Sequence, residues 1–362
     1  MPLRCPNSPF PSPLALVACF AGLFAGCVTY EPKPLVPAAT AAAFDKRSLE
    51  SPELRQFIEK QLGHELKAWP PHREPPGWTL PLLTLAAYYY HPSLEVARAN
   101  WAEAQAAVIT AGGRPNPTLT LSPGYNFNAA SGVTPWTPGL AFDLPLETMG
   151  KRGLRVLRAQ QSAEAARWQL AAAAWQVRAG VRDALLNFSD AMQRDQLLSA
   201  QYKLQEQFLG RLQERVDAGA IPRSDLTPAR VALEKLRLEA AELIRVKGES
   251  TVRLAEAVGV PVASLNRAQG IGLAWHFPDA THLTTPEARH RALTHRADIA
   301  AALVEYEASQ TALRLEIAKQ YPDVHLGSGF QWDQGESKWT FLNFSADRKS
   351  TRLNSSHLGI SY

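Results

Sequence analysis

The side chains that could do chemistry in this 362-residue sequence are few, and its cysteines are confined to one end. Cys5, Cys19 and Cys27 are the three cysteines, so the chain after position 27 can form neither a disulfide framework nor a cysteine-based zinc site. His290 and His295 lie five residues apart, whereas two metal ligands on one helical face are usually about four apart. We therefore expect these histidines on a solvated surface, and we predict no metal site and no cofactor.

Motifs that build enzyme active sites are absent from the sequence. It contains no Gly-x-Ser-x-Gly elbow, no His-Glu-x-x-His helix and no glycine loop that would cradle a phosphate. The net charge of +4 is modest, and no dense Lys/Arg block is interleaved with aromatic residues, so we do not expect nucleic acid as a partner. The sequence favours a protein with no catalytic residues that is not an enzyme.

Cys27 stands at the end of an N-terminal export signal. The apolar run Leu14–Ala25 is shorter than the roughly 20 residues that span a bilayer and fits the core of a signal peptide. Residues 23–26 resemble a bacterial lipobox, after which the exposed thiol can be acylated. We predict a signal peptide over 1–26 and lipidation at Cys27; an incidental cysteine after an ordinary signal is the alternative. Val28 in place of aspartate favours the outer membrane, as in lipoproteins generally.

The next part of the chain is rich in proline. We expect residues 27–81 to form a lipid-anchored N-terminal segment, with an extended linker over 28–45 and a short helix over Pro52–Lys67. From Leu82 to about Gly112 an alanine-rich pattern predicts a helix, which Gly112-Gly113 would end.

Residues 117–146 change to an alternating pattern and predict a β-hairpin. Bulky side chains occupy every second position in Thr118–Phe127 and again in Leu140–Leu146, and small or polar ones lie between them. Strands of a transmembrane barrel alternate in this way, and so does a half-exposed soluble hairpin. The side chains predicted to face lipid, including those of a later alternating stretch, are Leu119, Leu121, Tyr125, Phe127, Leu140, Phe142, Leu144, Val324, Leu326 and Phe330. Asp143, Asp323 and His325 then fall on the face expected to meet water.

Residues 150–259 predict a long helical hairpin. Residues 154–218 lack proline and carry apolar residues at helical spacing, so this helix of about 65 residues would be about 100 Å long. A break at Gly219–Pro222 leads to a second helix from near Ser224, with a heptad seam that begins at Leu226. The two helices must fold back on each other; a structural coiled coil is the alternative interpretation.

The sequence also repeats itself. A shift of 205 places residues 92–126 on 297–331 without a gap. The identical pairs are Ala97 with Ala302, Gln105 with Gln310, Ala107 with Ala312, Pro117 with Pro322, Leu121 with Leu326 and Gly124 with Gly329. We therefore predict a first repeat over 82–283, which ends in an equatorial loop over 260–283, and a second over 284–346.

In this order of elements the sequence resembles the TolC family of outer-membrane efflux proteins, whose protomers consist of two such repeats. The matching segments are Tyr30–Leu35, Asn116-Pro117, Leu144-Pro145-Leu146, Arg215–Ala229 and Arg296–Ile299. Gly150-Lys151-Arg152 is similar to the heavy-metal, CzcC-like branch. The resemblance covers residues 23 to about 345, and it rests on the order of the elements rather than on any single motif.

The resemblance implies a mainly α fold with a membrane β part. Long antiparallel α-helical hairpins would form a periplasmic tunnel, and the β-hairpins would contribute to a trimeric 12-stranded barrel. The number of strands favours the same oligomer. One chain has four strands, and a closed barrel needs at least about eight. An open sheet edge is not tolerated in lipid, so we expect a homotrimer.

The resemblance also implies a function and partners. We expect an outer-membrane channel subunit of a tripartite efflux system in a Gram-negative bacterium, lipid-anchored, with its helices projecting into the periplasm. It would be a passive export duct for small molecules or metal ions, coupled through a periplasmic adaptor to an inner-membrane pump of the RND type. A periplasmic coiled-coil scaffold lipoprotein without a pore is the alternative.

The resemblance places adaptor docking at the turn between the long helices. The candidate residues for this contact are Arg215, Gly219, Ile221, Pro222 and Asp225; in the alternative interpretation they only form a stable turn. Residues 347–362 break the pattern and are expected to be a non-native tail. A full subunit would continue with another helical pair, so we expect a C-terminally truncated chain.

Overall fold

The structure is a computed structural model of the chain. It describes residues 32, 34–66, 68–69, 71, 77–268, 270–272, 285–333 and 336–347, without the side chains of 341–347. The predicted signal peptide, Cys27 and residues 348–362 lie outside the described residues. The chain divides into two compact units, Met1–Lys46 and Arg47–Tyr362.

The described part of the first unit contains the helix α2 (Pro37–Asp45), none of whose side chains is buried. The extended linker predicted over 28–45 is therefore wrong from position 37 onward. Alanine has the highest helix propensity, and five of these nine residues are alanine. Pro37 stands in the first turn, where its missing N–H costs nothing.

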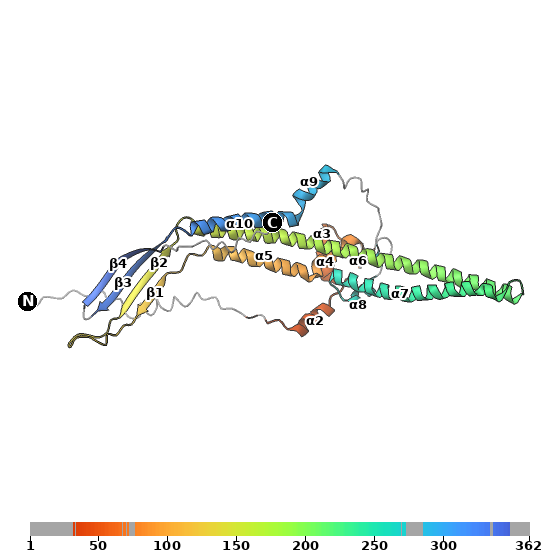
Figure 1. Cartoon of the computed structure of the whole chain (residues 1–362), viewed down its shortest axis with the longest axis horizontal. Coiled ribbons are helices and arrows are strands. Elements are labelled where there is room, and N and C mark those ends of the chain that lie inside the picture. The colour runs from red at the N-terminus through yellow and green to blue at the C-terminus, as the bar shows by residue number, and fades with distance from the viewer. Residues whose placement is uncertain are drawn as a thin grey trace, which may run out of the picture. The chain divides into compact units, whose positions relative to one another are not determined.

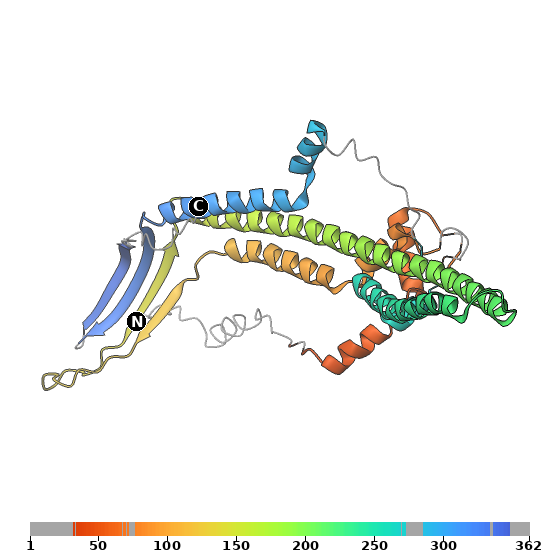
Figure 2. The same cartoon turned by 45° about the vertical axis from the view of Figure 1, so that its right-hand side comes forward.

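Long helices and a small sheet make up the second unit (Figure 1). Its described elements are α3 (Pro52–Leu62), α4 (Leu80–Tyr90), α5 (Pro92–Ala111), β1 (Thr118–Ser122), β2 (Gly139–Leu146), α6 (Lys151–Asp217), the 3-10 helix η1 (Arg223–Asp225), α7 (Leu226–Val258), α8 (Val262–Arg267), α9 (Pro286–His295), α10 (Ala297–Ala318), β3 (Asp323–Asp333) and β4 (Glu336–Asp347). α7 folds back along α6, and α5 and α10 flank the other half of α6 in both views (Figures 1 and 2).

The predicted long helical hairpin is confirmed. α6 is continuous over 67 residues, and α7 follows over 33 residues after a short turn. The predicted seam is also confirmed, because Leu226, Leu233 and Leu243 of α7 are buried.

Two helix bounds differ from the prediction. The single helix expected from Leu82 to Gly112 is interrupted at His91, whose backbone is extended, and Pro92 opens α5. Proline lacks the N–H that would continue the preceding helix, and it disfavours helical geometry in the residue before it. The short helix expected to reach Lys67 ends at Leu62, because Gly63 adopts a left-handed conformation.

The four strands form one antiparallel sheet in the order β1-β2-β3-β4. β1 has only five residues, so the strand predicted over Thr118–Phe127 is about twice too long. Pro123 follows β1 and has no N–H to donate to a ladder. Tyr125 pairs only through an isolated bridge with Trp136. Tyr125 and Phe127, predicted as lipid-facing strand residues, therefore lie beyond the strand.

The apolar core of the second unit lies around α4. Buried side chains of α3 and α4 pack there against α6 and α7, and they include Leu54, Ile58 and Leu83. Val181 and Leu185 belong to this core, so the apolar stripe predicted on α6 faces α4 as a helical period requires. Gly259 closes the core with φ of 82°; a Cβ there would lie 3.0 Å from the carbonyl oxygen of Tyr90.

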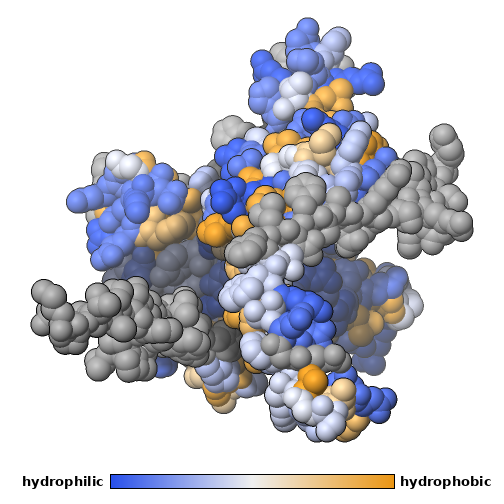
Figure 3. All heavy atoms as spheres, turned by 90° about the vertical axis from the view of Figure 1, so that its left-hand side faces the viewer, coloured by the Kyte–Doolittle hydropathy of each residue, from blue (hydrophilic) through white to orange (hydrophobic). Residues whose placement is uncertain are grey.

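The structure extends the internal repeat to include α4. The same shift of 205 carries Pro81 onto Pro286, so α9 stands in the second copy where α4 stands in the first. α9 has no buried side chain, and its end of the unit is largely hydrophilic (the top of Figure 3). The domain bounds predicted for the two repeats, 82–283 and 284–346, remain predictions.

Candidate functional site

One face of the sheet is apolar. The strand register places Leu119 opposite Phe142 and Leu121 opposite Leu140, and Leu140 lies opposite Phe330. Leu144 lies opposite Leu326 on the same face, and Leu146 lies opposite Val324. Leu119 and Leu121 are exposed by 71% and 72%. The strand residues predicted to face lipid therefore share one face, which is exposed on β1 and half-buried on β3. Contact of that face with lipid remains a prediction.

An aromatic cluster lies just beyond this face, at the tip of the β1–β2 hairpin. The ring of Tyr125 lies 5.0 Å from the ring of Phe127 and 5.0 Å from that of Trp136, centroid to centroid. All three side chains are exposed. Aromatic side chains at strand ends are typical of the girdles where transmembrane strands meet the membrane interface.

The opposite face of the sheet is polar. Asp143 and His325 lie diagonally across β2 and β3, and Nδ1 of His325 is 2.9 Å from Oδ2 of Asp143. Around them the cross-strand positions hold small residues, such as Ala141 opposite Gly329. The side chains that the sequence assigns to the polar face do lie together on it.

An ion pair with a buried lysine joins this polar face to α6. Lys151 is 6% exposed, and its Nζ donates to Oδ1 of Asp323 at 2.7 Å and to the carbonyl oxygen of Tyr321 at 2.7 Å. The backbone N–H of Thr148 donates to the same Oδ1 at 3.0 Å. A charge this deeply buried is tolerated only with such partners. The first turn of α6 is thereby bound to the junction between α10 and β3.

Two arginines bind the end of α5 to the start of α6. Nε of Arg152 donates to the carbonyl oxygen of Gly112 at 2.7 Å, and Nη2 of Arg155 donates to that of Gly113 at 3.2 Å. Arg155 also forms an ion pair with Glu147, and hydrogen bonding to this carboxylate raises the pKa of Arg155. The segment Gly150-Lys151-Arg152 was noted in the sequence only for its resemblance. In the structure it connects the start of α6 to the end of α5 and to the junction between α10 and β3. Sequence reasoning missed these contacts.

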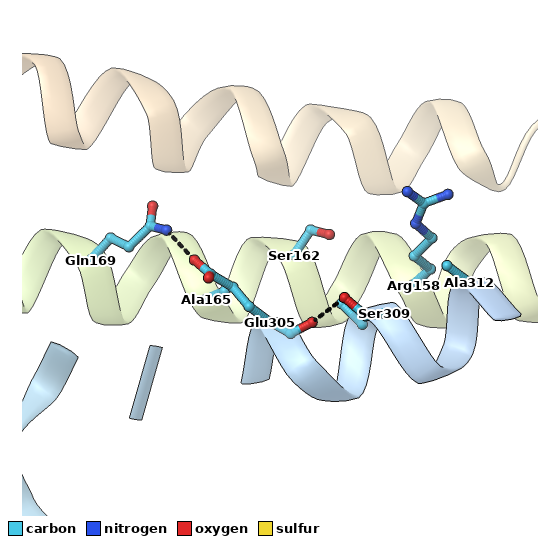
Figure 4. Close-up of a pocket in the computed structure, with 8 residues that line it drawn as sticks. Arg158, Ser162, Ala165, Gln169, Glu305, Ser309 and Ala312 are labelled. Atoms are coloured by element: carbon cyan, nitrogen blue, oxygen red, sulfur yellow. Dashed lines mark hydrogen bonds between the residues drawn. The ribbon is translucent and has the colours of Figure 1, made fainter. Parts of the chain in front are cut away.

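The polar stripe continues along α6. Lys151, Arg155, Arg158, Ser162, Ala165 and Gln169 follow one another at spacings of 4, 3, 4, 3 and 4, so they share one helical face. A groove of about 440 Å³ lies along this stripe, between α6 and α10, and small side chains line most of it (Figure 4). Nε2 of Gln169 donates across the groove to Oε1 of Glu305 at 2.5 Å. A second groove nearer the sheet has walls from α5, α6 and α10.

The turn between α6 and α7 holds the five residues predicted to dock an adaptor. Arg215 lies in the last turn of α6, and its carbonyl oxygen accepts from the N–H of Ala220 at 2.9 Å. Gly219 has φ of 70°, as the predicted break requires. Ile221 is half-buried, Pro222 is exposed, and Asp225 precedes α7 without a capping hydrogen bond from its side chain. The geometry of the turn is as predicted, and its docking role remains a prediction.

The described residues contain no group of three or more His, Cys, Asp or Glu side chains that could hold a metal ion. His290 and His295, both in α9, are exposed. Among these residues no helix is long and apolar enough to cross a membrane.

A fold of long helical hairpins joined to a four-stranded sheet matches that of known outer-membrane channels. Residues 87–260 match the family model described as "Outer membrane efflux protein". The resemblance stated from the sequence is thereby confirmed.

The chain is similar to the cobalt-zinc-cadmium resistance protein CzcC of Cupriavidus metallidurans, with 26% identity over 191 residues. That match covers 53% of this chain and 44% of the relative, so less than half of the relative's length is matched.

Solved channel structures are similar in fold. The outer membrane protein VceC of Vibrio cholerae has a TM-score of 0.60 and 19% identity, over 75% of this chain and 68% of that one. The CmeC outer membrane channel of Campylobacter jejuni has a TM-score of 0.59 and 14% identity, over 76% of this chain and 62% of that one. The predicted fold class, TolC-like with long helical hairpins and a small sheet, is confirmed.

Proposed function

We propose that the protein is the outer-membrane channel subunit of an efflux system and acts as a passive export duct. The observation that carries this proposal is the two-faced sheet whose polar face continues, through Lys151 and Asp323, into a polar stripe on a helix of about 100 Å. The apolar face suits lipid and the polar face suits water. The family match over residues 87–260 supports the same function.

The duct is completed by assembly. β1 and β4 are the outer strands of the sheet, and in lipid their free edges require strands from other copies. Three chains with four strands each supply twelve, which exceeds the about eight needed to close a barrel. We therefore propose a homotrimer in the outer membrane of a Gram-negative bacterium, with its helices in the periplasm.

The far end of the hairpin is the proposed docking site for a periplasmic adaptor, which connects the duct to an inner-membrane pump of the RND type. The turn presents exposed Pro222 beside half-buried Ile221, a small apolar surface on a rigid break. Replacing Ile221 with Asp should abolish adaptor crosslinking at this turn and leave the trimer intact. Crosslinking equal to that of the unchanged protein would remove the turn from the proposal.

The proposed cargo is small molecules or metal ions. Similarity to a protein named for cobalt, zinc and cadmium resistance favours divalent metal ions. Deleting the gene should then lower the tolerated concentration of these metals more than that of dyes or detergents. The reverse order of sensitivities would favour organic cargo.

Cys27 is the proposed lipid anchor, although it lies outside the described residues. Radiolabelled palmitate should enter the unchanged protein and not the Cys27→Ala variant. Equal labelling of both would leave the cysteine without this role.

Conductance tests the duct itself. The purified intact protein, reconstituted in planar bilayers, should pass stepwise current and run as a heat-resistant trimer. A stable lipid-anchored oligomer that passes no current would instead support the alternative, a periplasmic coiled-coil scaffold without a pore.

A further inference from the structure

We propose that the grooved face of α6 and α10 lines the passage, and that Arg158 and Glu305 are the charges that permeating solutes meet there. This inference rests on the proposed duct and names residues of its inner wall. It concerns the groove drawn in Figure 4, where Arg158 and Glu305 project from two neighbouring helices.

Continuity with the sheet identifies which face of α6 points into the passage. Lys151 is on the same helical stripe as Arg158 and Gln169, and its Nζ binds Asp323 on the polar face of the sheet. The apolar face of the sheet lies on the other side. If the polar face of the sheet meets the water of the pore, the stripe that continues it meets the same water.

The charges along this stripe are not equivalent. Lys151 is paired with Asp323, and Arg155 with Glu147. Arg158 is exposed and forms no ion pair within the described part of the chain, although it lines both grooves. Its charge is therefore available to a solute, whereas those of Lys151 and Arg155 are compensated.

Glu305 supplies the opposite charge farther from the sheet. Its carboxylate accepts a hydrogen bond from the neutral amide of Gln169, so its negative charge is not cancelled. Gln169 marks the level of Glu305 along α6, because the two side chains are hydrogen-bonded. Arg158 and Gln169 are eleven positions apart, which is about 16 Å along the helix at 1.5 Å per residue. That exceeds the screening length of about 8 Å at physiological salt, so the charges of Arg158 and Glu305 act separately.

Small side chains keep the wall between these charges hollow. Ser162 and Ala165 line it from α6, and Ala308, Ser309 and Ala312 line it from α10. In three copies Arg158 would form a positive ring near the sheet, and Glu305 a negative ring farther down. Rings of charged side chains are a common source of ion selectivity in channels.

Neutralising the two charges should shift selectivity in opposite directions. In the intact protein in planar bilayers under a KCl gradient, Arg158→Gln should raise the K⁺ to Cl⁻ permeability ratio by about twofold or more. Glu305→Gln should lower it by a similar factor. Arg167→Gln is the matched control, because Arg167 is an exposed arginine on the opposite side of α6, paired with Glu164; its ratio should not change.

A second measurement does not depend on small changes in selectivity. The variants Arg158→Cys and Glu305→Cys should react with a charged methanethiosulfonate reagent, and the reaction should lower the single-channel current. The reagent should leave the current of Arg167→Cys unchanged. Open channels whose selectivity and reagent response are the same in all three variants would overturn this inference and leave the duct standing. Unchanged protein that passes no current would overturn the proposed function, and the inference with it.

Discussion

α4 and α9 occupy equivalent positions in the two copies of the repeat, yet α4 buries five side chains and α9 buries none. Both helices carry a proline at their start and lead into a longer helix. α4 packs against α6 and α7, whereas the described residues contain no second copy of these two helices that could cover α9. α9 also carries three charged residues and two histidines. An equivalent place in the topology therefore does not imply an equivalent place in the core.

The two copies are held in place by different interactions. The first copy is fixed by apolar packing of α4 against α3, α6 and α7. The second copy packs on α6 through α10, which buries Leu315 and four smaller side chains. It is also fixed at Asp323, the residue that stands where the first copy has Thr118. Thr118 has no charge, so the ion pair made by Lys151 cannot be repeated at β1. Each copy can be weakened by a change that should leave the other largely unaffected.

The largest effect is expected in the α4 core. Leu83→Ala removes a fully buried side chain and should lower the free energy of unfolding by about 2–5 kcal/mol. Leu293→Ala in α9 removes a side chain that is 54% exposed. The free energy of unfolding should then change by no more than about 0.5 kcal/mol. Urea titration of both variants compares them directly. Equal losses would mean that α9 is as deeply packed as α4.

An arginine on the apolar face of the sheet should destabilise the protein equally in both copies. Leu121 and Leu326 are equivalent in the repeat, and Arg at either position should cost about 2–4 kcal/mol if both face lipid near the midplane. Arg at Thr120, on the polar face, should cost much less. Folding into lipid vesicles, followed by the shift in gel mobility, measures all three. A cost at Thr120 as high as at Leu121 would reverse our assignment of the two faces.

The ion pair of the second copy should have a smaller effect. Lys151→Met leaves Asp323 without its cation, and loss of one partner of a fully buried pair costs roughly 3–5 kcal/mol. Because the side chain of Asp323 is 35% exposed, we expect about 1–3 kcal/mol. Thermal unfolding should show this loss, whereas Lys319→Met, which breaks the exposed pair with Glu316, should change little. Equal effects would show that burial of Lys151 adds no stability.

The smallest expected effect is a dependence of stability on pH that arises at His91 in the first copy. Burial lowers the pKa of His91, aided by nearby Arg47 and opposed by Glu256. The folded chain thus favours the neutral imidazole, whose Nδ1 accepts from the N–H of Ser93 at 3.3 Å and caps α5. The unfolded chain binds this proton more readily, so stability should fall as the pH drops below about 6.5.

The equivalent residue in the second copy is Arg296, which stays charged and is paired with Asp298. His91→Asn keeps a capping side chain that does not titrate. Its thermal midpoint should therefore change less between pH 7.5 and 5.5 than that of the unchanged protein. An identical pH response in the variant would assign the effect to other groups.

Local patterns in the sequence were sufficient to predict the long elements. α6 and α7 follow from a long proline-free period and a heptad seam, signals that need no knowledge of distant residues. The short β1 and the break before α5 could also have been predicted, because Pro123 and Pro92 mark them in the sequence.

The remaining features depend on contacts between distant parts of the chain. Lys151 and Asp323 are 172 residues apart, and Gln169 and Glu305 are 136 apart. No local period indicates that these pairs meet. The exposure of α9 likewise depends on which helices pack on it.

The unbroken length of α6 has a mechanical consequence. A rigid rod of 67 residues, about 100 Å long, acts as a lever arm. A tilt of about 1° at one end displaces the other end by about 1.7 Å, roughly the rise of one helical residue. Lys151 lies at the start of this rod and is fixed to Asp323, whereas the turn at Gly219 lies just past its other end. Adjustments of a fraction of an ångström beside the sheet would therefore be magnified at the turn between α6 and α7.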